Sequence, residues 1–333
     1  MVILITKTMS LRLLLSGKGI IMNKKYELAH KETVNVNGEL RELYRIRALK
    51  SFGDVREGDF GGLVRSEDNL AQKGNCWIYD NSIVCSKAIV HGDAKIRHRS
   101  IITCDARVFS KADIFDSEIS GNVKISGSSQ VRNSEIKDNS RIMGKPIINN
   151  AIVSGKSSII SNAEVFSTEQ PVMIEDSTIG TGAKVSGSCV IRRSEIGNAS
   201  LKSLGNYSLC CEDSKIKSGL IESSRVIMCT VSDDTKIKNS HVVNSDISGY
   251  AVINNSYVME STVTDYVLIS TKCADRSTIR RSKLSDRCAV IDSSVVNLDI
   301  SENVYIENSY LGCDRVKPHL LTGSTRYIGE TEY

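Results

Sequence analysis

The chain has 333 residues, of which 43 are basic and 39 acidic, and aromatic residues make up only 5% of it. Three of the basic residues stand in the first 21 positions, which hold no acid, so the remainder carries 40 basic (43 − 3) against 39 acidic residues. A surface this close to neutrality argues against nucleic-acid binding through a broad basic face. The scarcity of large rings argues against one irregular globular core and favours a stack of repeated units.

The first 21 residues contain a short apolar run, Leu11 to Leu15, and little else of note. This run is too short for the apolar region of a signal peptide, and no stretch approaches the ~20 apolar residues of a membrane span. Lys18-Gly19 would be encoded as AAR-GGN, which resembles a bacterial ribosome-binding site shortly before Met22. We therefore predict Met22 as the true start, and residues 1–21 as a non-native extension or a disordered segment.

Residues 22–76 do not follow the repeat found further on and are predicted to form an N-terminal β cap. Within them, Thr33–Val36 and Leu43–Arg47 flank the turn dipeptide Asn37-Gly38, which is typical of a β-hairpin. The open end of a β-solenoid is a sheet edge with unpaired backbone groups. The hairpin is therefore expected to cover the first coil, with Trp77 packed beneath it.

Aliphatic residues recur at steps of five or six between residues 77 and 315, and each is flanked mostly by polar residues. This alternation is typical of short strands with one side chain inside and its neighbours outside. Three sets of residues repeat every 17 positions, which predicts coils with three sides. The sets are Ile102, Ile119, Ile136 and Val153; Val108, Ile125, Ile142 and Ile159; and Ile114, Val131, Ile148 and Val165.

Pairs such as Asn133-Ser134 and Asp176-Ser177 precede many of these aliphatic residues and are suited to turning the chain at a corner. The predicted fold is therefore all-β: a triangular, parallel β-helix (a solenoid) with an N-terminal β-hairpin cap. Residues 77–315 have room for about 14 coils stacked at about 4.8 Å.

Nearer the C-terminus the period shortens to 16, and three columns are expected at that spacing. The columns predicted there are Ile247, Val263, Ile279, Val295 and Leu311; Val242, Val258, Ala274, Val290 and Ile306; and Ile237, Ile253 and Ile269.

Two stretches interrupt the period, Ser167–Met173 with Pro171 and Lys202–Glu212 with Gly205. Loops on a rigid scaffold often carry function, but a corner that has absorbed an insertion is the plainer explanation. Residues 316–333 are predicted to be a C-terminal capping tail.

The cysteines are scattered along the chain, with no CxxC pair and no histidine at ligand spacing from a cysteine pair. They are typical of small buried residues in a reducing compartment, which predicts a cytoplasmic protein. No metal site is predicted.

Corner motifs of the form DSEI, NSEI, DSTI and NSYV resemble those of hexapeptide-repeat proteins. A longer segment, FGDVREGDFGGLVRSEDNLAQKGNCWIYDNSIVCSKAIVHGDAKI from Phe52 to Ile96, resembles bacterial and phage acetyltransferases of the YdcK type. The resemblance implies a left-handed β-helix. It also implies a CoA-dependent acyltransferase, with acetyl-CoA bound in a groove between the subunits of a homotrimer.

An acyltransferase of this kind needs a general base, usually histidine. None of the five histidines stands in an extruded loop with the Asn-x-x-x-His pattern that active members of the family tend to show. His91, beside Gly92 and Asp93, is the predicted catalytic residue if the protein is an enzyme. The three clustered histidines of γ-carbonic anhydrases and the phosphate loop of nucleotidyltransferases are also missing from the sequence.

Two functions are left open by the sequence. The first is a β-helix scaffold or binding protein that has lost catalysis, with a protein partner or self-association, and with neither nucleic acid nor membrane as a partner. The alternative is acetyl transfer to a hydroxyl or amine. Phe109, Phe115 and Phe166 are predicted to form the interaction surface.

Overall fold

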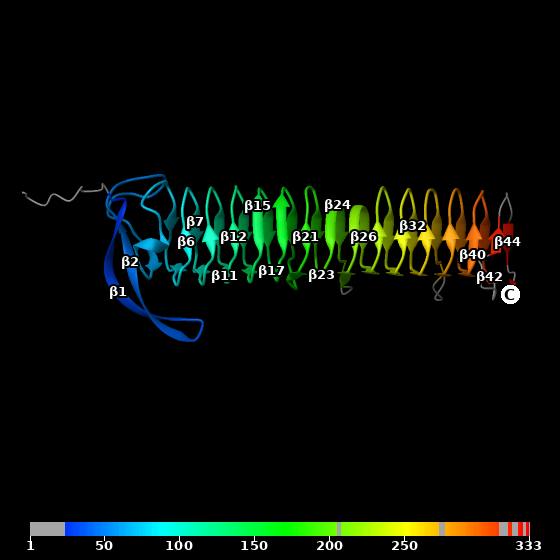
Figure 1. Cartoon of the computed structure of the whole chain (residues 1–333), viewed down its shortest axis with the longest axis horizontal. Coiled ribbons are helices and arrows are strands. Elements are labelled where there is room, and N and C mark those ends of the chain that lie inside the picture. Colours follow the sequence, from blue (N-terminus) through cyan, green and yellow to red (C-terminus); the bar gives the residue numbers. More distant parts are fainter. Residues whose placement is uncertain are drawn as a thin grey trace, which may run out of the picture.

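The computed structural model describes residues 24–204, 208–272, 277–312, 319–321, 326–328 and 331–332. The chain forms a long parallel β-solenoid of about 14 turns with an antiparallel hairpin at its N-terminal end (Figure 1), which confirms the predicted fold class. The left hand that the resemblance implies stays a prediction. Residues 1–21, predicted to be an extension, lie outside the described residues.

The hairpin consists of β1 (Tyr26–Val36) and β2 (Glu39–Ala48), joined by the predicted turn. Asn37 and Gly38 have φ angles of 53° and 90°, as a type I′ turn requires. β2 pairs antiparallel with β3 (Phe60–Val64), and β3 pairs in parallel with β5 (Ile83–Val84) of the solenoid. The cap is therefore continuous with the coils through backbone hydrogen bonds.

Trp77 lies under the cap with only 2% of its surface exposed. Its ring meets the edges of Tyr26 and Phe52 at centroid distances of 6.2 and 5.4 Å. The Lys25 ammonium, itself buried, donates to the Cys76 carbonyl oxygen at 2.8 Å. The Tyr26 hydroxyl donates to the Leu70 carbonyl oxygen at 2.7 Å, so the cap occupies acceptors that an open coil end would leave unpaired.

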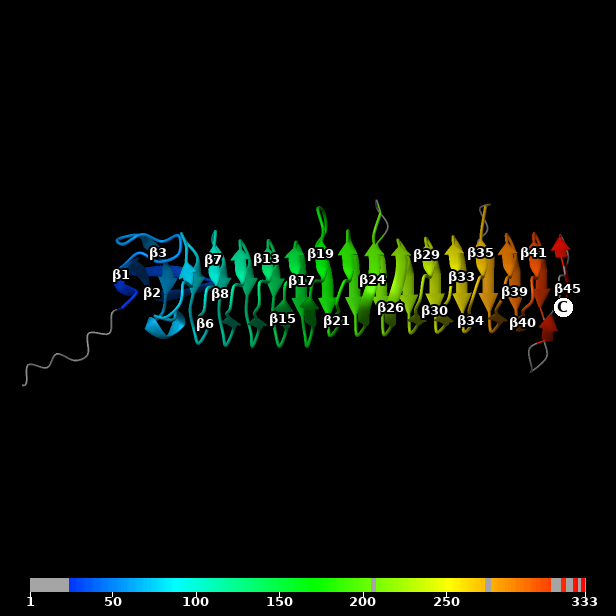
Figure 2. The same cartoon turned by 90° about the horizontal axis from the view of Figure 1, so that it is seen from above.

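Each coil contributes one strand to each of three faces, named here A, B and C in chain order (Figure 2). Face A consists of β5 (Ile83–Val84), β8 (Ile101–Ile102), β11 (Glu118–Ile119), β14 (Glu135–Ile136), β17 (Ala151–Ser154), β20 (Val172–Glu175), β23 (Cys189–Arg192), β25 (Leu209–Glu212), β27 (Arg225–Ile227), β30 (His241–Val243), β33 (Ser256–Met259), β36 (Ser277–Arg280), β39 (Ser294–Val296), β42 (Tyr310–Gly312) and β45 (Thr331–Glu332).

Face B consists of β6 (Ile89–Val90), β9 (Arg107–Val108), β12 (Lys124–Ile125), β15 (Arg141–Gly144), β18 (Ser158–Ser161), β21 (Thr178–Ile179), the first halves of β24 (Glu195–Lys202) and β26 (Lys215–Glu222), β28 (Thr230–Val231), β31 (Asp246–Ile247), β34 (Thr262–Val263), β37 (Lys283–Leu284), β40 (Leu298–Ile300) and β43 (His319–Leu321). A 3₁₀ turn, η1 (Glu67–Asn69), precedes its first rung.

Face C consists of β4 (Trp77–Ile78), β7 (Lys95–Arg97), β10 (Asp113–Phe115), β13 (Gln130–Arg132), β16 (Ile147–Asn149), β19 (Glu164–Phe166), β22 (Lys184–Ser186), the second halves of β24 and β26, β29 (Lys236–Lys238), β32 (Val252–Asn254), β35 (Leu268–Ser270), β38 (Ala289–Ile291), β41 (Tyr305–Glu307) and β44 (Arg326–Ile328). Strands β43, β44 and β45, in the predicted tail, pair in parallel with the preceding coil.

The interior is a stack of aliphatic side chains, one from each strand. Ile102, Ile119, Ile136 and Val153 pair in register along face A and are fully buried. The other two sets with a period of 17 occupy faces B and C in the same way. The columns predicted for the first half of the solenoid are therefore confirmed.

Of the columns predicted for the second half, Ile237, Ile253 and Ile269 are confirmed on face C. The other two are wrong after Val263 and after Val258. Val263 pairs with Leu284 and not with Ile279, and Ile279 pairs with Val258 on face A, each pair 21 positions apart. Five residues are inserted between β35 and β36, within a stretch where 273–276, including Ala274, lie outside the described residues. Five residues are the length of one side of a coil. The spacing of aliphatic residues is therefore unchanged after the insertion, but each residue lies one face away from the face that the constant period predicts.

The two predicted interruptions lengthen their coils in the same place. Val153 and Ile174 are 21 positions apart, and Ile191 and Cys211 are 20 apart, where neighbouring coils need 15 to 17. Like the insertion after β35, both occur between a face C strand and the next face A strand. All three insertions therefore lie on one edge of the prism, the C–A edge.

Serine side chains form hydrogen-bonded ladders inside the corners. Ser117, for example, donates to the Phe115 carbonyl oxygen at 2.8 Å and accepts from the backbone N–H of Ser134 at 3.2 Å. The preceding residues, Asp116 and Asn133, have φ angles of 45° and 47°, the left-handed conformation that Asp and Asn tolerate best. Many of the Asn-Ser and Asp-Ser pairs are thus corners whose buried hydroxyl donates to the backbone of its own coil and accepts from the backbone of the next.

In the described part of the chain, no helix is long and apolar enough to cross a membrane. The structure describes eight cysteines as free thiols, and six of these are buried.

Candidate functional site

His91, the predicted catalytic residue, follows β6 and stacks on Phe109 of the next rung, with centroids 5.0 Å apart and rings nearly parallel. It does not line any of the pockets described below. Its partner is therefore an aromatic ring and not the carboxylate or carbonyl that usually orients a catalytic imidazole.

The three predicted surface phenylalanines do not share one face. Phe115 and Phe166 point outward from face C, three rungs apart, with Arg132 and Asn149 between them in register. Phe109 follows β9 of face B. Phe166 is 46% exposed and the other two are half-buried, so their side chains do not form a continuous strip.

A groove lies instead on the edge between faces B and C, where two consecutive coils have a shortened corner. Six positions separate the inner residues of faces B and C in the flanking coils, as from Ile179 to Val185. From Ile196 to Leu201 the step is five, and it is five again in the next coil. The missing residue removes the turn, so β24 and β26 each run through the corner as one eight-residue strand.

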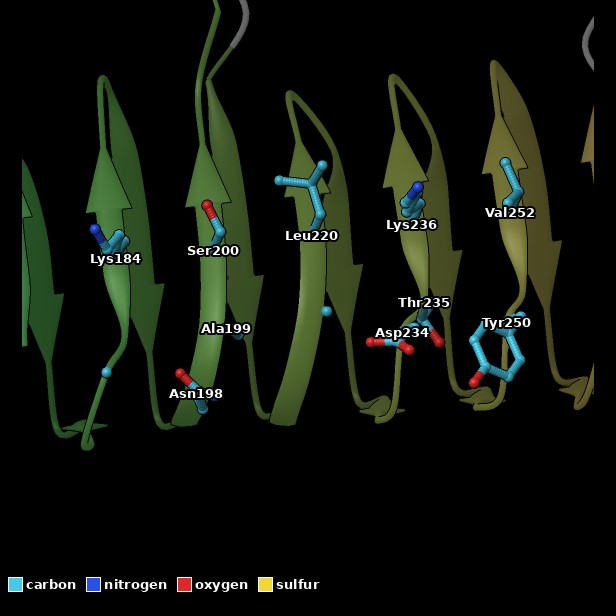
Figure 3. Close-up of a pocket in the computed structure, with 12 residues that line it drawn as sticks. Lys184, Asn198, Ala199, Ser200, Leu220, Asp234, Thr235, Lys236, Tyr250 and Val252 are labelled. Carbon is cyan, nitrogen blue, oxygen red and sulfur yellow. The ribbon is translucent and has the colours of Figure 1, made fainter.

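We call the resulting hollow the edge groove. Its volume is about 690 Å³, and Figure 3 shows its lining side chains along consecutive rungs. Its lining consists of Gly182, Lys184, Asn198, Ala199, Ser200, Gly219, Leu220, Asp234, Thr235, Lys236, Tyr250 and Val252. Lys184, Ser200, Leu220, Lys236 and Val252 are in register on successive rungs.

Two glycines keep the groove open. Gly219 has a φ angle of 106°, and a Cβ there would meet the Thr235 carbonyl oxygen at 2.7 Å. A Cβ at Gly182 would lie 2.4 Å from the Asn198 Oδ1. The Asn198 amide can therefore occupy its position only because residue 182 has no side chain. Any larger residue at either position would clash or fill the hollow.

Tyr250 stands at one end of the groove (Figure 3). Its ring stacks on Tyr266 of the next rung, with centroids 4.8 Å apart and planes within 10°. The two side chains are 54% and 59% exposed. Because Tyr266 covers one face of the Tyr250 ring, the opposite face points toward the preceding rungs, which line the groove.

The charges around the groove nearly balance. Lys184 pairs with Glu164 at 3.4 Å. Lys236 and Asp234 belong to the same rung and carry opposite charges. The groove therefore presents ammonium groups, a carboxylate, an amide and a hydroxyl. Its net charge, counted with Glu164, is close to zero.

A second pocket, of about 310 Å³, lies on the C–A edge beside the Lys202–Glu212 insertion. His241 lines it together with Arg225, Asn239, Asn255 and several serines. Arg225, His241 and Tyr257 are in register on three rungs of face A. This places a histidine and a guanidinium next to an inserted loop.

In the described residues, no group of three or more His, Cys, Asp or Glu side chains is arranged to hold a metal ion. The edge groove was not predicted from the sequence, although two signals mark it. One is the pair of five-residue steps at consecutive corners. The other is the recurrence of tyrosine at 250 and 266, one coil apart.

Known proteins show a limited similarity to this chain. No family model matches it. Over 79 residues it is 39% identical to the "Uncharacterized acetyltransferase YdcK" of Escherichia coli (strain K12), which corresponds to 23% of this chain and 24% of that protein. The chain thus spans about a quarter of the length of this relative in the matched region.

A crystal structure of a "putative acetyltransferase" from Desulfovibrio desulfuricans G20 matches 65% of this chain and 63% of the other, at 9% identity and a TM-score of 0.22. A TM-score this low carries no argument about the fold. The resemblance predicted from the sequence is confirmed as a distant one: the chain is a β-solenoid protein similar, over part of its length, to acetyltransferases of the YdcK type.

Proposed function

We propose that the chain is a binding scaffold related to the acetyltransferase-like β-solenoids, and that it holds its ligand in the edge groove without a chemical step. The observation that carries the proposal is the pair of shortened corners, which open a groove lined by both polar and apolar side chains beside an exposed tyrosine stack. Fold alone does not imply function, so the proposal rests on this site.

A CoA-dependent acyltransferase is the second candidate, and the pocket around His241 favours it. A histidine beside an inserted loop is where a general base for an acceptor hydroxyl is expected. Arg225, one rung away, would suit a phosphate of acetyl-CoA. The acyl-CoA groove would also need a second subunit, so this candidate requires a homotrimer.

Light scattering and a thermal shift with acetyl-CoA separate the two candidates. A scaffold should show no stabilisation by acetyl-CoA and no acetyl transfer to hydroxyl or amine acceptors. An acyltransferase should be a trimer, and ligand at a hundred times its Kd should stabilise it by about 2.7 kcal/mol. Loss of turnover in His241→Ala, or in His91→Ala, would identify the base and would contradict the scaffold proposal.

Self-association or a protein partner is part of the same proposal. The exposed apolar side chains on the outer faces, among them Phe166 and Met173 with 46% and 40% exposure, are available for such contacts. Light scattering at several concentrations tests the self-association directly.

A further inference from the structure

We propose that the edge groove binds a neutral oligosaccharide, with one sugar ring stacked on Tyr250 and neighbouring hydroxyls bonded to Asn198, Ser200 and Asp234. The inference rests on the proposed function in that it takes the groove as the binding site.

The aromatic platform is the first argument. A tyrosine ring is an apolar, flat surface with a polar rim, and the C–H face of a pyranose ring matches such a surface. Tyr250 is held in place by its stack on Tyr266, so little conformational entropy is lost when a ligand lies on its free face. More than half of the Tyr250 surface is exposed, although it is an aromatic residue.

The polar groups are the second argument. The groove offers a carboxylate, an amide, a hydroxyl and ammonium groups, which together accept from and donate to hydroxyls. An anionic ligand would require a surplus of positive charge. Here Glu164 is paired with Lys184, and Asp234 shares a rung with Lys236, so a neutral ligand suits the groove better.

The shape is the third argument. The lining comes from five consecutive rungs, whose four intervals of about 4.8 Å give a length of about 19 Å along the edge. A groove of this length has room for a short oligosaccharide, one ring of which lies on the free face of Tyr250. A stable protein interface takes about 20–30 residues from each side, whereas 12 line this groove.

The test is isothermal titration of the full chain with maltohexaose, cellohexaose, chitohexaose and, as the charged comparator, a hexamer of galacturonic acid. We expect at least one neutral hexasaccharide to bind. Tyr250→Ala should weaken that binding about tenfold or more, and Asp234→Asn should weaken it several-fold. Tyr310→Ala, which removes an exposed tyrosine from face A, is the matched control and should bind as the parent does.

The far-ultraviolet circular dichroism of Tyr250→Ala should match that of the parent, because the side chain lies outside the core. Absence of binding by every neutral hexasaccharide, binding of the galacturonic acid hexamer alone, or equal affinity of Tyr250→Ala and the parent would each overturn the inference. These outcomes leave the scaffold proposal standing. That proposal fails separately if acetyl transfer is observed.

Discussion

At the scale of single residues, the corners of the solenoid depend on small buried side chains that form hydrogen bonds with the backbone. Cys229 occupies a ladder position that serine holds in other coils: its N–H donates to the Ser214 hydroxyl at 3.1 Å, and its thiol donates to the Ile227 carbonyl oxygen at 2.9 Å. Burial raises the pKa of the Cys229 thiol to about 11 and that of Cys189 to about 12. The protonated thiol is therefore part of the fold.

The raised pKa values predict a loss of stability in alkaline solution. An unfolded thiol ionises near pH 9, whereas the folded Cys229 thiol keeps its proton up to about pH 11. The stabilisation is complete below pH 9 and falls by about 1.4 kcal/mol per pH unit between these values. Urea unfolding at pH 8, 9 and 10 should show a shallower pH dependence for Cys229→Ser. The exposed Cys104→Ser serves as the control, and an equal change in both variants would contradict the prediction.

The interior columns give a second prediction at this scale. Ile136 is fully buried between Ile119 and Val153, so Ile136→Asp would place a carboxylate without a partner between two rungs. We expect a loss of several kcal/mol in the free energy of unfolding. Arg141→Asp puts the same carboxylate at an exposed position on the next strand and should melt close to the parent. Equal melting curves for the two variants, followed by circular dichroism, would show that Ile136 is not an interior residue.

At the scale of elements, each side of a coil is a unit of five or six residues. The corners differ in length, because some contain inserted residues and others lack one. The first columns could be predicted because their residues repeat at one constant period on one face. The columns near Ile279 could not, because an insertion as long as one side keeps the spacing and changes the face. The hairpin could be predicted from Asn37-Gly38, whose turn chemistry is local.

The edge groove could not be predicted from the sequence because it results from corners that are one residue shorter than their neighbours. A step of five is as common along the chain as a step of six, so the two short steps become a signal only after each strand has been assigned to its face. The prediction of His91 rests on its neighbours in the sequence, Gly92 and Asp93. Its actual neighbour, Phe109, is one coil away in the chain.

Restoring the two shortened corners tests the element that builds the groove. One glycine inserted between Asn198 and Ala199, and another between Ser218 and Gly219, would return both corners to six positions. We expect the circular dichroism spectrum of the solenoid to persist, because the flanking coils already have this length. Binding to the groove should be lost. Retained ligand affinity would show that the shortened corners are not what forms the site.

At the scale of the whole molecule, the solenoid is a one-dimensional stack in which each coil contacts only its neighbours. Stability in such a stack is a sum of coil and interface contributions, and the ends open first unless they are capped. Here the N-terminal cap packs on Trp77, the only tryptophan of the chain. Tryptophan fluorescence therefore reports on the cap, and circular dichroism reports on the whole stack.

Weakening the cap should separate these two signals. Tyr26→Ala removes the hydroxyl that donates to Leu70 and the ring that meets Trp77. We expect its fluorescence transition to shift to lower temperature by more than its circular dichroism transition does, because the opening begins at that end. Tyr266→Ala, far along the stack, is the control. Coincident transitions in Tyr26→Ala would indicate that the molecule unfolds as a single cooperative unit.

The insertion between β35 and β36 has a consequence for how such chains are compared. An alignment scored on aliphatic identity can slide by one side of a coil at almost no penalty, because every side offers the same kind of residue at the same spacing. Two proteins could then share their architecture coil for coil and still be matched with their faces rotated by a third of a turn. For chains of this kind, homologous positions are better assigned by the face of the prism (A, B or C) on which each residue lies than by its place in the repeat.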